Sequence, residues 1–362
     1  MRIGIILHPY DEDKPAGLAR TIFEWTKGML SIDKKNEYIV FLKNTPRKNP
    51  DLPGKNWRVE STGGGIFWLD NLRKKTLCDV YVFNTPVMPL FFKPKRSVVL
   101  ALDFAYYYLA PKTIRGQFFK WFTYFYHFLS LKRANSIVAI SRATRDDVVK
   151  LFGIPADRMS VIYLGYKHIC AVSETAVSGT PSEKFFFFAG IIKERKNVYN
   201  TVRAFHLFSQ KVKGFKLAIA GSPTGSYFEK IKKYIAENHL SDSVIFLGHL
   251  NDGELSYVYK KAYAFLFPTL IEGFGMPVAE AMDCGVPVIT SNQSSLKEVG
   301  GEGSSLLVDP YDPADIADKM VRLTEDESLR RRLIEKGNLQ SKKFSWEHSA
   351  RELLAILHEV VK

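Results

Sequence analysis

Short apolar runs alternate with longer amphipathic stretches along almost the whole chain, and this alternation limits the possible folds more than any other feature of the sequence. Several runs are unbroken valine and isoleucine series, which are typical of strands covered on both faces in a parallel sheet. They predict strands at residues 2–7, 37–42, 56–60, 79–83, 97–102, 136–140, 160–164, 185–189, 216–220, 244–247, 264–267, 286–290 and 305–308. The amphipathic stretches predict helices at residues 18–30, 112–132, 142–152, 198–212, 226–238, 254–261, 277–284, 313–324, 328–342 and 346–361.

One segment interrupts this alternation. Residues 171–182 read AVSETAVSGTPS, a composition typical of a linker. We therefore predict a first domain over residues 1–170, a linker at 171–184, a second domain over 185–343 and a terminal helical segment at 344–362. Strand–helix repetition on both sides of the linker predicts two doubly wound, Rossmann-like α/β domains that face a central cleft. Ligands bind beyond the carboxyl ends of the strands in such sheets, so the cleft is the expected site.

The composition excludes several classes of protein. With 46% hydrophobic and 25% charged residues, the chain is neither disordered nor fibrous. The net charge of +13 favours anionic partners. The basic residues are dispersed and match no known DNA- or RNA-binding motif, so we expect no nucleic acid partner. No stretch approaches the roughly 18 uncharged apolar residues of a membrane-spanning helix, and the N-terminal apolar run is too short for a signal peptide, so we expect a cytoplasmic protein.

The cysteines and histidines point to neither a metal nor a disulfide. Cys78, Cys170 and Cys284 are far apart and odd in number, and no zinc spacing or disulfide framework can be written from them. The eight histidines are scattered and form no HExxH motif. We therefore expect a reducing compartment, no bound metal and no cofactor.

The most informative motif is PTLIEGFGMPVAE at residues 268–280, which follows a predicted strand and opens a helix with a proline. Gly273 and Gly275 leave backbone N–H groups free to face an anion at the helix N-terminus. Glu280, about one turn into the helix, can accept two hydrogen bonds from a diol. The alternative is a structural turn whose acidic residues balance the helix dipole. The spacing of Glu272 and Glu280 around GFGMP favours a binding site.

A second motif, GIIKERKN at residues 190–197, also lies between a strand and a helix. Gly190 opens it, and Arg195 and Lys196 then offer a planar guanidinium and a point charge, which together suit a diphosphate. The alternative is a solvated run of charges. Both motifs follow strands of one predicted parallel sheet, and this favours phosphate binding.

The loop after the first strand carries weaker candidates. Gly17 can allow a substrate close to the backbone and Arg20 can point into the cleft, although a structural role for both is equally open. Residues 11–13 read Asp-Glu-Asp and fit the Asp-x-Asp pattern of metal-dependent sugar transferases. Because that tripeptide is common, a solvated loop is the favoured interpretation.

Residues 106–133 are unusually aromatic and basic, and between residues 112 and 132 the aromatic residues exceed what one core-facing stripe requires. One interpretation is a bulky helix buried in the first domain, which at least Phe118, Phe122 and Phe125 would join. The other is an anionic membrane surface as partner, with rings among the headgroups and cations against the lipid. The net charge of +13 would support such peripheral attachment on the inner face of the membrane.

In series, these motifs resemble the retaining glycosyltransferases of family 4, which have the two-Rossmann GT-B fold. The resemblance covers nearly the whole chain and is most specific at residues 267–282. It also includes ISRATRDDVV from residue 140, VIYLG from 161, VIFLGHL from 244, GVPVI from 285 and FSW from 344.

The resemblance implies that Arg195 and Lys196 hold the donor diphosphate, that Glu280 holds the ribose, and that Glu272 and the following backbone contact the donor sugar. It also implies that the terminal helix from Trp346 crosses back to the first domain. The donor-side set is Gly17, Gly190, Arg195, Lys196, Gly248, His249, Leu250, Glu272, Gly273, Phe274, Gly275, Met276 and Glu280, with catalytic roles for Arg195, Lys196 and Glu272. Arg20 and Asp103 are the acceptor-side candidates.

Two positions depart from the family pattern. Ala16 stands where the family often has the first of two glycines, and Leu102 precedes Asp103 where it often has a histidine. That histidine usually lines the acceptor side near the reacting carbon. Its replacement keeps open a catalytically silent protein of the same fold that binds nucleotide sugars or acts as a scaffold.

The activity that the resemblance implies is retaining hexosyl transfer from a nucleotide-diphosphate sugar. GDP-mannose is favoured ahead of UDP-glucose-type donors, and the acceptor is a saccharide or lipid-linked saccharide of cell-surface polysaccharide synthesis. The departing phosphate takes the acceptor proton, so the protein mainly positions both substrates and stabilises the leaving diphosphate. Arg195 and Lys196 then replace a divalent metal, and we expect metal-independent transfer.

Overall fold

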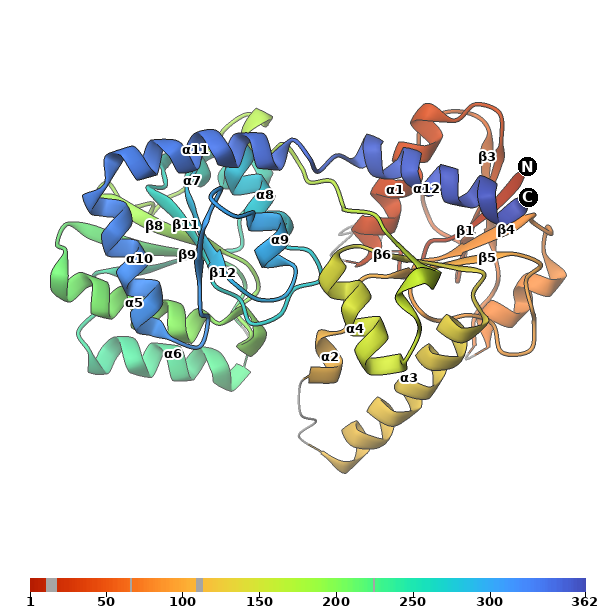
Figure 1. Ribbon diagram of the computed structural model, residues 1–362, viewed down its shortest axis with the longest axis horizontal. Coiled ribbons are helices and arrows are strands. Elements are labelled where there is room, and N and C mark those ends of the chain that lie inside the picture. The colour runs from red at the N-terminus through yellow and green to blue at the C-terminus, as the bar shows by residue number, and fades with distance from the viewer. Residues whose placement is uncertain (11–17, 66, 109–112, 224) are drawn as a thin grey trace. The chain divides into compact units, whose positions relative to one another are not determined.

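The computed structural model describes residues 1–10, 18–65, 67–108, 113–223 and 225–362, and it contains two compact units (Figure 1). The first is Met1–Gly165 with Ser345–Lys362, and the second is Tyr166–Phe344. The first boundary therefore lies five residues before the predicted one, and the segment predicted as a linker belongs to the second unit. Each unit is built around one parallel sheet.

The first unit contains a seven-stranded sheet with the strand order β3-β2-β1-β4-β5-β6-β7. The order reverses direction between β1 and β4, so this is the topological switch point of the sheet. The central strands are fully buried, as expected for runs covered on both faces. The strands are β1 (Arg2–Ile6), β2 (Glu37–Leu42), β3 (Trp57–Ser61), β4 (Val80–Phe83), β5 (Ser97–Ala101), β6 (Ser136–Ala139) and β7 (Met159–Val161).

Helices cover this sheet, and the last helix of the chain belongs to them. In Figure 1, α12 lies along α1, and the Trp25 and Trp346 rings meet edge to face with their centroids 6.4 Å apart. Arg96 Nε donates to the Val360 carbonyl oxygen at 2.7 Å at the other end of α12. The helices are α1 (Leu18–Ile32), η1 (Trp68–Lys74), α2 (Ala105–Tyr108), α3 (Ile114–Arg133), α4 (Arg142–Phe152), η2 (Ala156–Arg158) and α12 (Trp346–Val361).

The aromatic helix α3 exposes the phenylalanines that one interpretation of the sequence placed in the core. Phe118, Phe122 and Phe125 are exposed, so the prediction that they join the core is wrong. The face that carries Leu131 is buried instead. A helix with apolar residues all round has no single preferred inward face, so the sequence pattern could not select it. Among the helices of the described residues, none is long and apolar enough to cross a membrane.

The second unit contains a six-stranded parallel sheet with the order β10-β9-β8-β11-β12-β13, and its topological switch point lies between β8 and β11. The strands are β8 (Lys184–Ala189), β9 (Phe215–Ala220), β10 (Val244–Gly248), β11 (Ala264–Phe267), β12 (Val288–Ser291) and β13 (Leu306–Val308). The helices are η3 (Ile169–Ala171), η4 (Glu194–Lys196), α5 (Val198–Lys211), α6 (Gly225–Glu237), α7 (Asp252–Lys261), α8 (Met276–Asp283), α9 (Leu296–Gly300), α10 (Pro313–Glu325) and α11 (Glu327–Ser341). The predicted strands and long helices lie within a few residues of these bounds, whereas the short helices were not predicted.

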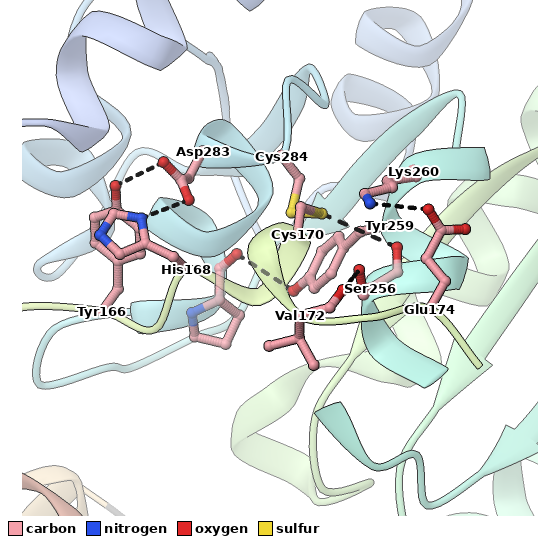
Figure 2. Close-up of a disulfide and its surroundings, with 11 residues drawn as sticks. Tyr166, His168, Cys170, Val172, Glu174, Ser256, Tyr259, Lys260, Asp283 and Cys284 are labelled. Carbon is pink, nitrogen blue, oxygen red and sulfur yellow. Dashed lines mark hydrogen bonds and ion pairs between the residues drawn. A yellow bond between two sulfur atoms is a disulfide. The ribbon is translucent and has the colours of Figure 1, made fainter. Parts of the chain in front are cut away.

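A disulfide joins Cys170 of η3 to Cys284 at the end of α8 (Figure 2). The expectation that the cysteines form no disulfide is therefore wrong. The two residues are 114 positions apart in sequence, and only the packing of η3 brings their Cα atoms to 5.4 Å. Asp283 reinforces the junction, because its carboxylate binds the Tyr166 hydroxyl and the His168 Nδ1, both at 2.9 Å. The start of the second unit is thus fastened to the end of α8.

The predicted linker is held against α7 by hydrogen bonds. Thr175 N donates to the Gly253 carbonyl at 3.0 Å, and the Ser256 hydroxyl donates to the Val172 carbonyl at 3.1 Å. These contacts explain why a segment of linker-like composition packs as part of a domain.

Reduction of the disulfide is expected to lower the free energy of unfolding of the second unit by about 2–5 kcal/mol, because the cross-link restricts the unfolded chain over a long loop. Melting of the protein with and without a phosphine reductant measures the effect. A Cys170→Ser/Cys284→Ser variant should melt at the lower temperature in both conditions. An unchanged melting temperature on reduction of the wild-type protein would contradict the expectation.

Candidate functional site

The candidate site is built from two loops at the switch point of the second sheet. The first loop, residues 190–197, follows β8, and the second, residues 268–275, follows β11. The two strands are parallel neighbours, with Phe186 paired to Ala264. Their carboxyl ends therefore meet at one edge of the sheet, where ligands of open α/β sheets bind.

A buried asparagine fixes the first loop. Asn197 has a left-handed backbone (φ 59°) and is the N-cap of α5. Its Nδ2 donates to the Pro268 carbonyl at 2.8 Å and to the Pro310 carbonyl at 2.6 Å. Asn197 thus binds the loop after β8 to the loops after β11 and β13. No role was predicted for Asn197, although asparagine is enriched in this backbone conformation.

Two serines before α9 hold the second loop. The Ser294 hydroxyl donates to the Glu272 carbonyl at 2.6 Å, and the Ser295 hydroxyl donates to the carbonyls of Glu272 and Phe274 at 2.9 and 2.8 Å. Gly275 then turns into α8 with φ 102°, and a Cβ atom there would lie 2.4 Å from Leu296 Cδ2. The serines were not predicted because they lie 22 and 23 residues after Glu272 in the sequence.

The three predicted catalytic residues come together between these loops. Lys196 Nζ forms an ion pair with the Glu272 carboxylate. Arg195 Nη1 lies 3.5 Å from the same carboxylate and donates to the Ile271 carbonyl at 3.3 Å. The Lys196 and Glu272 side chains are 12% and 10% exposed, so solvent screens this pair little. Lys196 Nζ also lies 5.0 Å from the centroid of the Phe267 ring.

Glu280 lies on α8, one turn beyond Gly275, and is buried. It is close enough to Tyr259 for its negative charge to add to the effect of burial, and both raise the pKa of the Tyr259 phenol. The neighbouring Phe274 is also buried, and its ring packs edge to face on Phe344 at 5.3 Å. The loop and the first turn of α8 thus form one packed element. The role of Glu280 toward a ribose stays a prediction.

Gly221 lies between the first loop and β10, and no sequence pattern indicated a role for it. A Cβ atom on Gly221, which follows β9, would lie 1.9 Å from the Gly190 carbonyl oxygen. Gly221 N donates to the Gly248 carbonyl at 2.7 Å. The backbone after β8 therefore contacts the backbone after β9, which in turn contacts the last residue of β10. This chain of contacts brings Gly248 into the same loop cluster as Gly190.

The remaining donor-side residue positions are placed by the same elements. His249 is exposed and Leu250 is buried just after β10, and Gly273 and Met276 flank the turn into α8. Their contacts with a donor stay predictions. Among the residues that the structure describes, no group of three histidine, cysteine or acidic side chains is placed to hold a metal ion.

The acceptor-side candidates belong to the first unit. Arg20 lies half-buried in the first turn of α1, and Gly17 and residues 11–13 lie outside the described residues. Asp103 follows β5, and its carboxylate accepts a hydrogen bond from Ala105 N at 2.7 Å at the start of α2. Leu102, where the resembled family often has a histidine, is buried.

Two family sequence models match the chain in succession. Glycosyltransferase Family 4 matches residues 17–168, and Glycosyl transferases group 1 matches residues 174–340. The O-antigen chain mannosyltransferase B of Escherichia coli is 30% identical over 60% of this chain and 59% of its own length. A serotype-specific mannosyltransferase WbdA of Escherichia coli is 31% identical over 60% of this chain, but over only 28% of its own length. The chain thus spans less than two thirds of these relatives.

Solved structures with the same arrangement of elements confirm the predicted fold class. A sucrose-phosphate synthase from Thermosynechococcus elongatus superposes with a TM-score of 0.78 at 18% identity, over 99% of this chain and 98% of its own. The HepE protein of Anabaena, solved with UDP and glucose, superposes with a TM-score of 0.76 at 16% identity, over 98% and 99%. Two Rossmann-like units, with a loop site at the switch point of the sheet in the second unit, define a protein of the GT-B fold class. The chain belongs to family 4 of the glycosyltransferases.

Proposed function

We propose that this protein transfers a hexose, with retention, from a nucleotide-diphosphate sugar to a saccharide or lipid-linked saccharide acceptor of cell-surface polysaccharide synthesis. The observation that carries the proposal is the meeting of Arg195, Lys196 and Glu272 at the carboxyl ends of β8 and β11. Carboxyl ends at a switch point are where nucleotides bind in such sheets. The amide groups at the start of α8 add an anion-binding surface beside the two cations.

The ion pair gives Glu272 a role in the binding step. A diphosphate carries more negative charge than one carboxylate, so it competes with Glu272 for Lys196 and Arg195. A Glu272 carboxylate released in this way can accept hydrogen bonds from hydroxyl groups of the donor sugar. The same two cations then stabilise the charge that develops on the leaving diphosphate.

The acceptor proton leaves with the phosphate in this proposal. The departing phosphate oxygen accepts the proton of the attacking hydroxyl on the same face of the sugar, so no side chain acts as general base. The chain's residues position both substrates and hold the leaving group. Arg20 and Asp103 of the first unit are the proposed acceptor-side contacts.

GDP-mannose is the favoured donor, ahead of UDP-glucose-type donors. The support is the set of relatives at 28–31% identity that are named mannosyltransferases. The HepE structures with UDP and UDP-glucose are only 16% identical to this chain, so they bear on the fold and not on the donor.

Thermal-shift measurements with GDP, UDP and ADP test the donor. A nucleotide that binds only the native state at about 100 times its Kd stabilises that state by about 2.7 kcal/mol, and we expect a rise of several degrees for GDP. Transfer or hydrolysis of GDP-mannose and UDP-glucose then tests the reaction. A protein stabilised by none of the three nucleotides would contradict the proposal.

Transfer is expected to continue at an unchanged rate in EDTA, because Arg195 and Lys196 supply the positive charge that a metal supplies elsewhere. The measurement compares initial rates with excess EDTA, with added Mg²⁺ or Mn²⁺, and without either. Loss of transfer in EDTA that returns with a divalent metal would contradict the metal-free mechanism.

A second candidate function rests on the buried Leu102. If the acceptor side needs a histidine there, the protein binds nucleotide sugars without turning them over. Nucleotide binding with neither transfer nor hydrolysis of any donor would favour this function over the first.

A further inference from the structure

The outward face of α3 is strongly apolar although it faces solvent. Phe118, Trp121, Phe122 and Phe125 are 75%, 72%, 57% and 59% exposed. They are spaced three, four and seven residues apart, which places them on one side of a helix. Large aromatic residues are normally among the most buried in a domain. Four of them on one exposed stripe therefore mark an interaction surface.

This stripe is not a displaced part of the core, because the opposite face of α3 makes the packing contacts. The Tyr124 ring stacks on Phe152 with the centroids 5.1 Å apart, and Leu131 is fully buried. His127 Nδ1 lies 2.9 Å from the Tyr107 hydroxyl, and burial lowers the pKa of His127 to about 4. The core-facing side of α3 is thus packed by other residues, and the stripe takes no part in that packing.

The first unit has two further apolar features near α3. Phe67 and Phe91 are exposed and meet edge to face at 5.6 Å. The loop that carries Phe91 is fastened to the end of α3, where Arg133 Nη1 donates to the Pro89 carbonyl at 3.0 Å. Trp121 also lines a cavity. This cavity has a volume of about 530 Å³ and is lined by Tyr107, Gln117, Lys120, Trp121, Tyr124 and Leu151.

The chain segment that contains α3 is strongly basic, although Asp70 lies near Tyr126 of α3 and Asp146 and Asp147 directly follow the segment. Residues 80–145 contain ten lysines and arginines against a single acidic residue, Asp103, so they carry +9 of the net charge of +13. Arg115 and Lys132 are exposed near the two ends of α3, and Lys93 is exposed two residues after Phe91. Exposed rings flanked by cations match an anionic lipid surface, where rings lie among the headgroups and cations meet phosphate.

We propose that the outward face of α3 docks the first unit on an anionic bilayer surface. A second copy of the chain is the other obvious occupant, but a symmetric dimer through this face would bring two surfaces of the same positive sign together. The N-terminal half of α3 extends away from the sheet in Figure 1. This inference is independent of the proposed sugar transfer.

Vesicle binding tests the proposal without reference to activity. We expect sedimentation with vesicles that contain about one-third phosphatidylglycerol, little with phosphatidylcholine alone, and weakening at high salt. The triple variant Phe118→Ser/Phe122→Ser/Phe125→Ser should weaken vesicle binding by on the order of a hundredfold. This assumes that each ring becomes half-buried in the lipid and contributes about fivefold to the affinity. Arg115→Gln should weaken it by about fivefold.

The matched control removes exposed apolar residues elsewhere. Tyr311 and Leu339 of the second unit are 61% and 64% exposed, and Tyr311→Ser/Leu339→Ser should bind vesicles as the wild type does. Melting temperatures of all variants should stay close to that of the wild type, because the substituted side chains face solvent.

Trp121 provides a local signal. Of the five tryptophans it is the exposed one, while Trp25, Trp57, Trp68 and Trp346 are buried or half-buried. Anionic vesicles should shift the emission to shorter wavelength and protect it from an aqueous quencher, and Trp121→Phe should abolish both changes.

Three outcomes would overturn the proposal. The first is no binding of the wild type to anionic vesicles at low salt. The second is binding that the triple phenylalanine variant leaves unchanged. The third is self-association that depends on these phenylalanines without any vesicle binding, which would assign the face to a second copy of the chain.

Discussion

Lys196→Ala should lower kcat/KM for sugar transfer by about 10²- to 10³-fold, the usual cost of removing one group that stabilises charge in a transition state. Lys196 is expected to act on the leaving diphosphate, so most of the loss should appear in kcat. Initial rates over a range of donor concentrations measure the effect. The prediction rests on the position of Nζ beside Glu272, at the carboxyl ends of β8 and β11.

The same substitution should also destabilise the second unit, and a second variant separates the two effects. Lys196→Ala leaves a nearly buried carboxylate without its main partner, although Arg195 stays 3.5 Å away. We expect a loss of about 1–3 kcal/mol in the free energy of unfolding. Adding Glu272→Gln removes the carboxylate charge and should restore much of the melting temperature. Transfer should stay low in the double variant.

Two results would contradict this assignment. A Lys196→Ala protein with an unchanged rate would remove Lys196 from the mechanism. Recovery of transfer in the double variant would show that the single substitution acted only through folding.

Gly221→Ala should destabilise the second unit by about 3 kcal/mol or more and abolish nucleotide binding. The added Cβ would lie 1.9 Å from the Gly190 carbonyl oxygen, and Gly221 has φ 150°, a backbone conformation that alanine rarely adopts. Neither backbone segment can move alone, because Gly190 N donates to Ala220 and Gly221 N donates to Gly248. The loop that carries Arg195 and Lys196 must therefore shift. Thermal melting and nucleotide titration measure the two effects.

Gly214→Ala is the matched control, since Gly214 flanks the other end of β9. Its backbone is also left-handed, with φ 79°, but a Cβ there would meet no atom within 4 Å. We expect this variant to lose only about 1 kcal/mol of stability from backbone strain and to bind nucleotide normally. Equal effects of the two substitutions would mean that backbone strain, and not contact with the Gly190 loop, explains the loss.

The order of strands and long helices was largely readable from local patterns. The run Phe185–Phe188 is fully buried in β8, as its unbroken apolar character predicts. Helix starts carry local signals of the same kind that were not used: α7, predicted from residue 254, begins at Asp252, after a capping box in which the Asn251 side chain accepts from Glu254 N and the Glu254 carboxylate accepts from Asn251 N. Such signals come from residues at most four positions apart, so they can be recognised in the sequence without knowledge of the fold.

The site was predicted less completely. The two loops were found because their charged and glycine residues lie directly between a strand and a helix, and the structure brings Lys196 to Glu272. The residues that hold these loops in place were not predicted. Asn197, Ser295 and Gly221 act on carbonyl groups that lie far away in sequence, and nothing in their immediate neighbours indicates those partners.

The sequence by itself determined where strands, helices and charged loops occur, because these depend on neighbouring residues along the chain. Tertiary structure alone decided which distant groups meet, as with Cys170 and Cys284, because such contacts follow from strand order and helix packing. It also decided which side of α3 faces outward. A helix with aromatic residues all round carries no period that favours one face, so the shape of the surface it packs against selects the buried side.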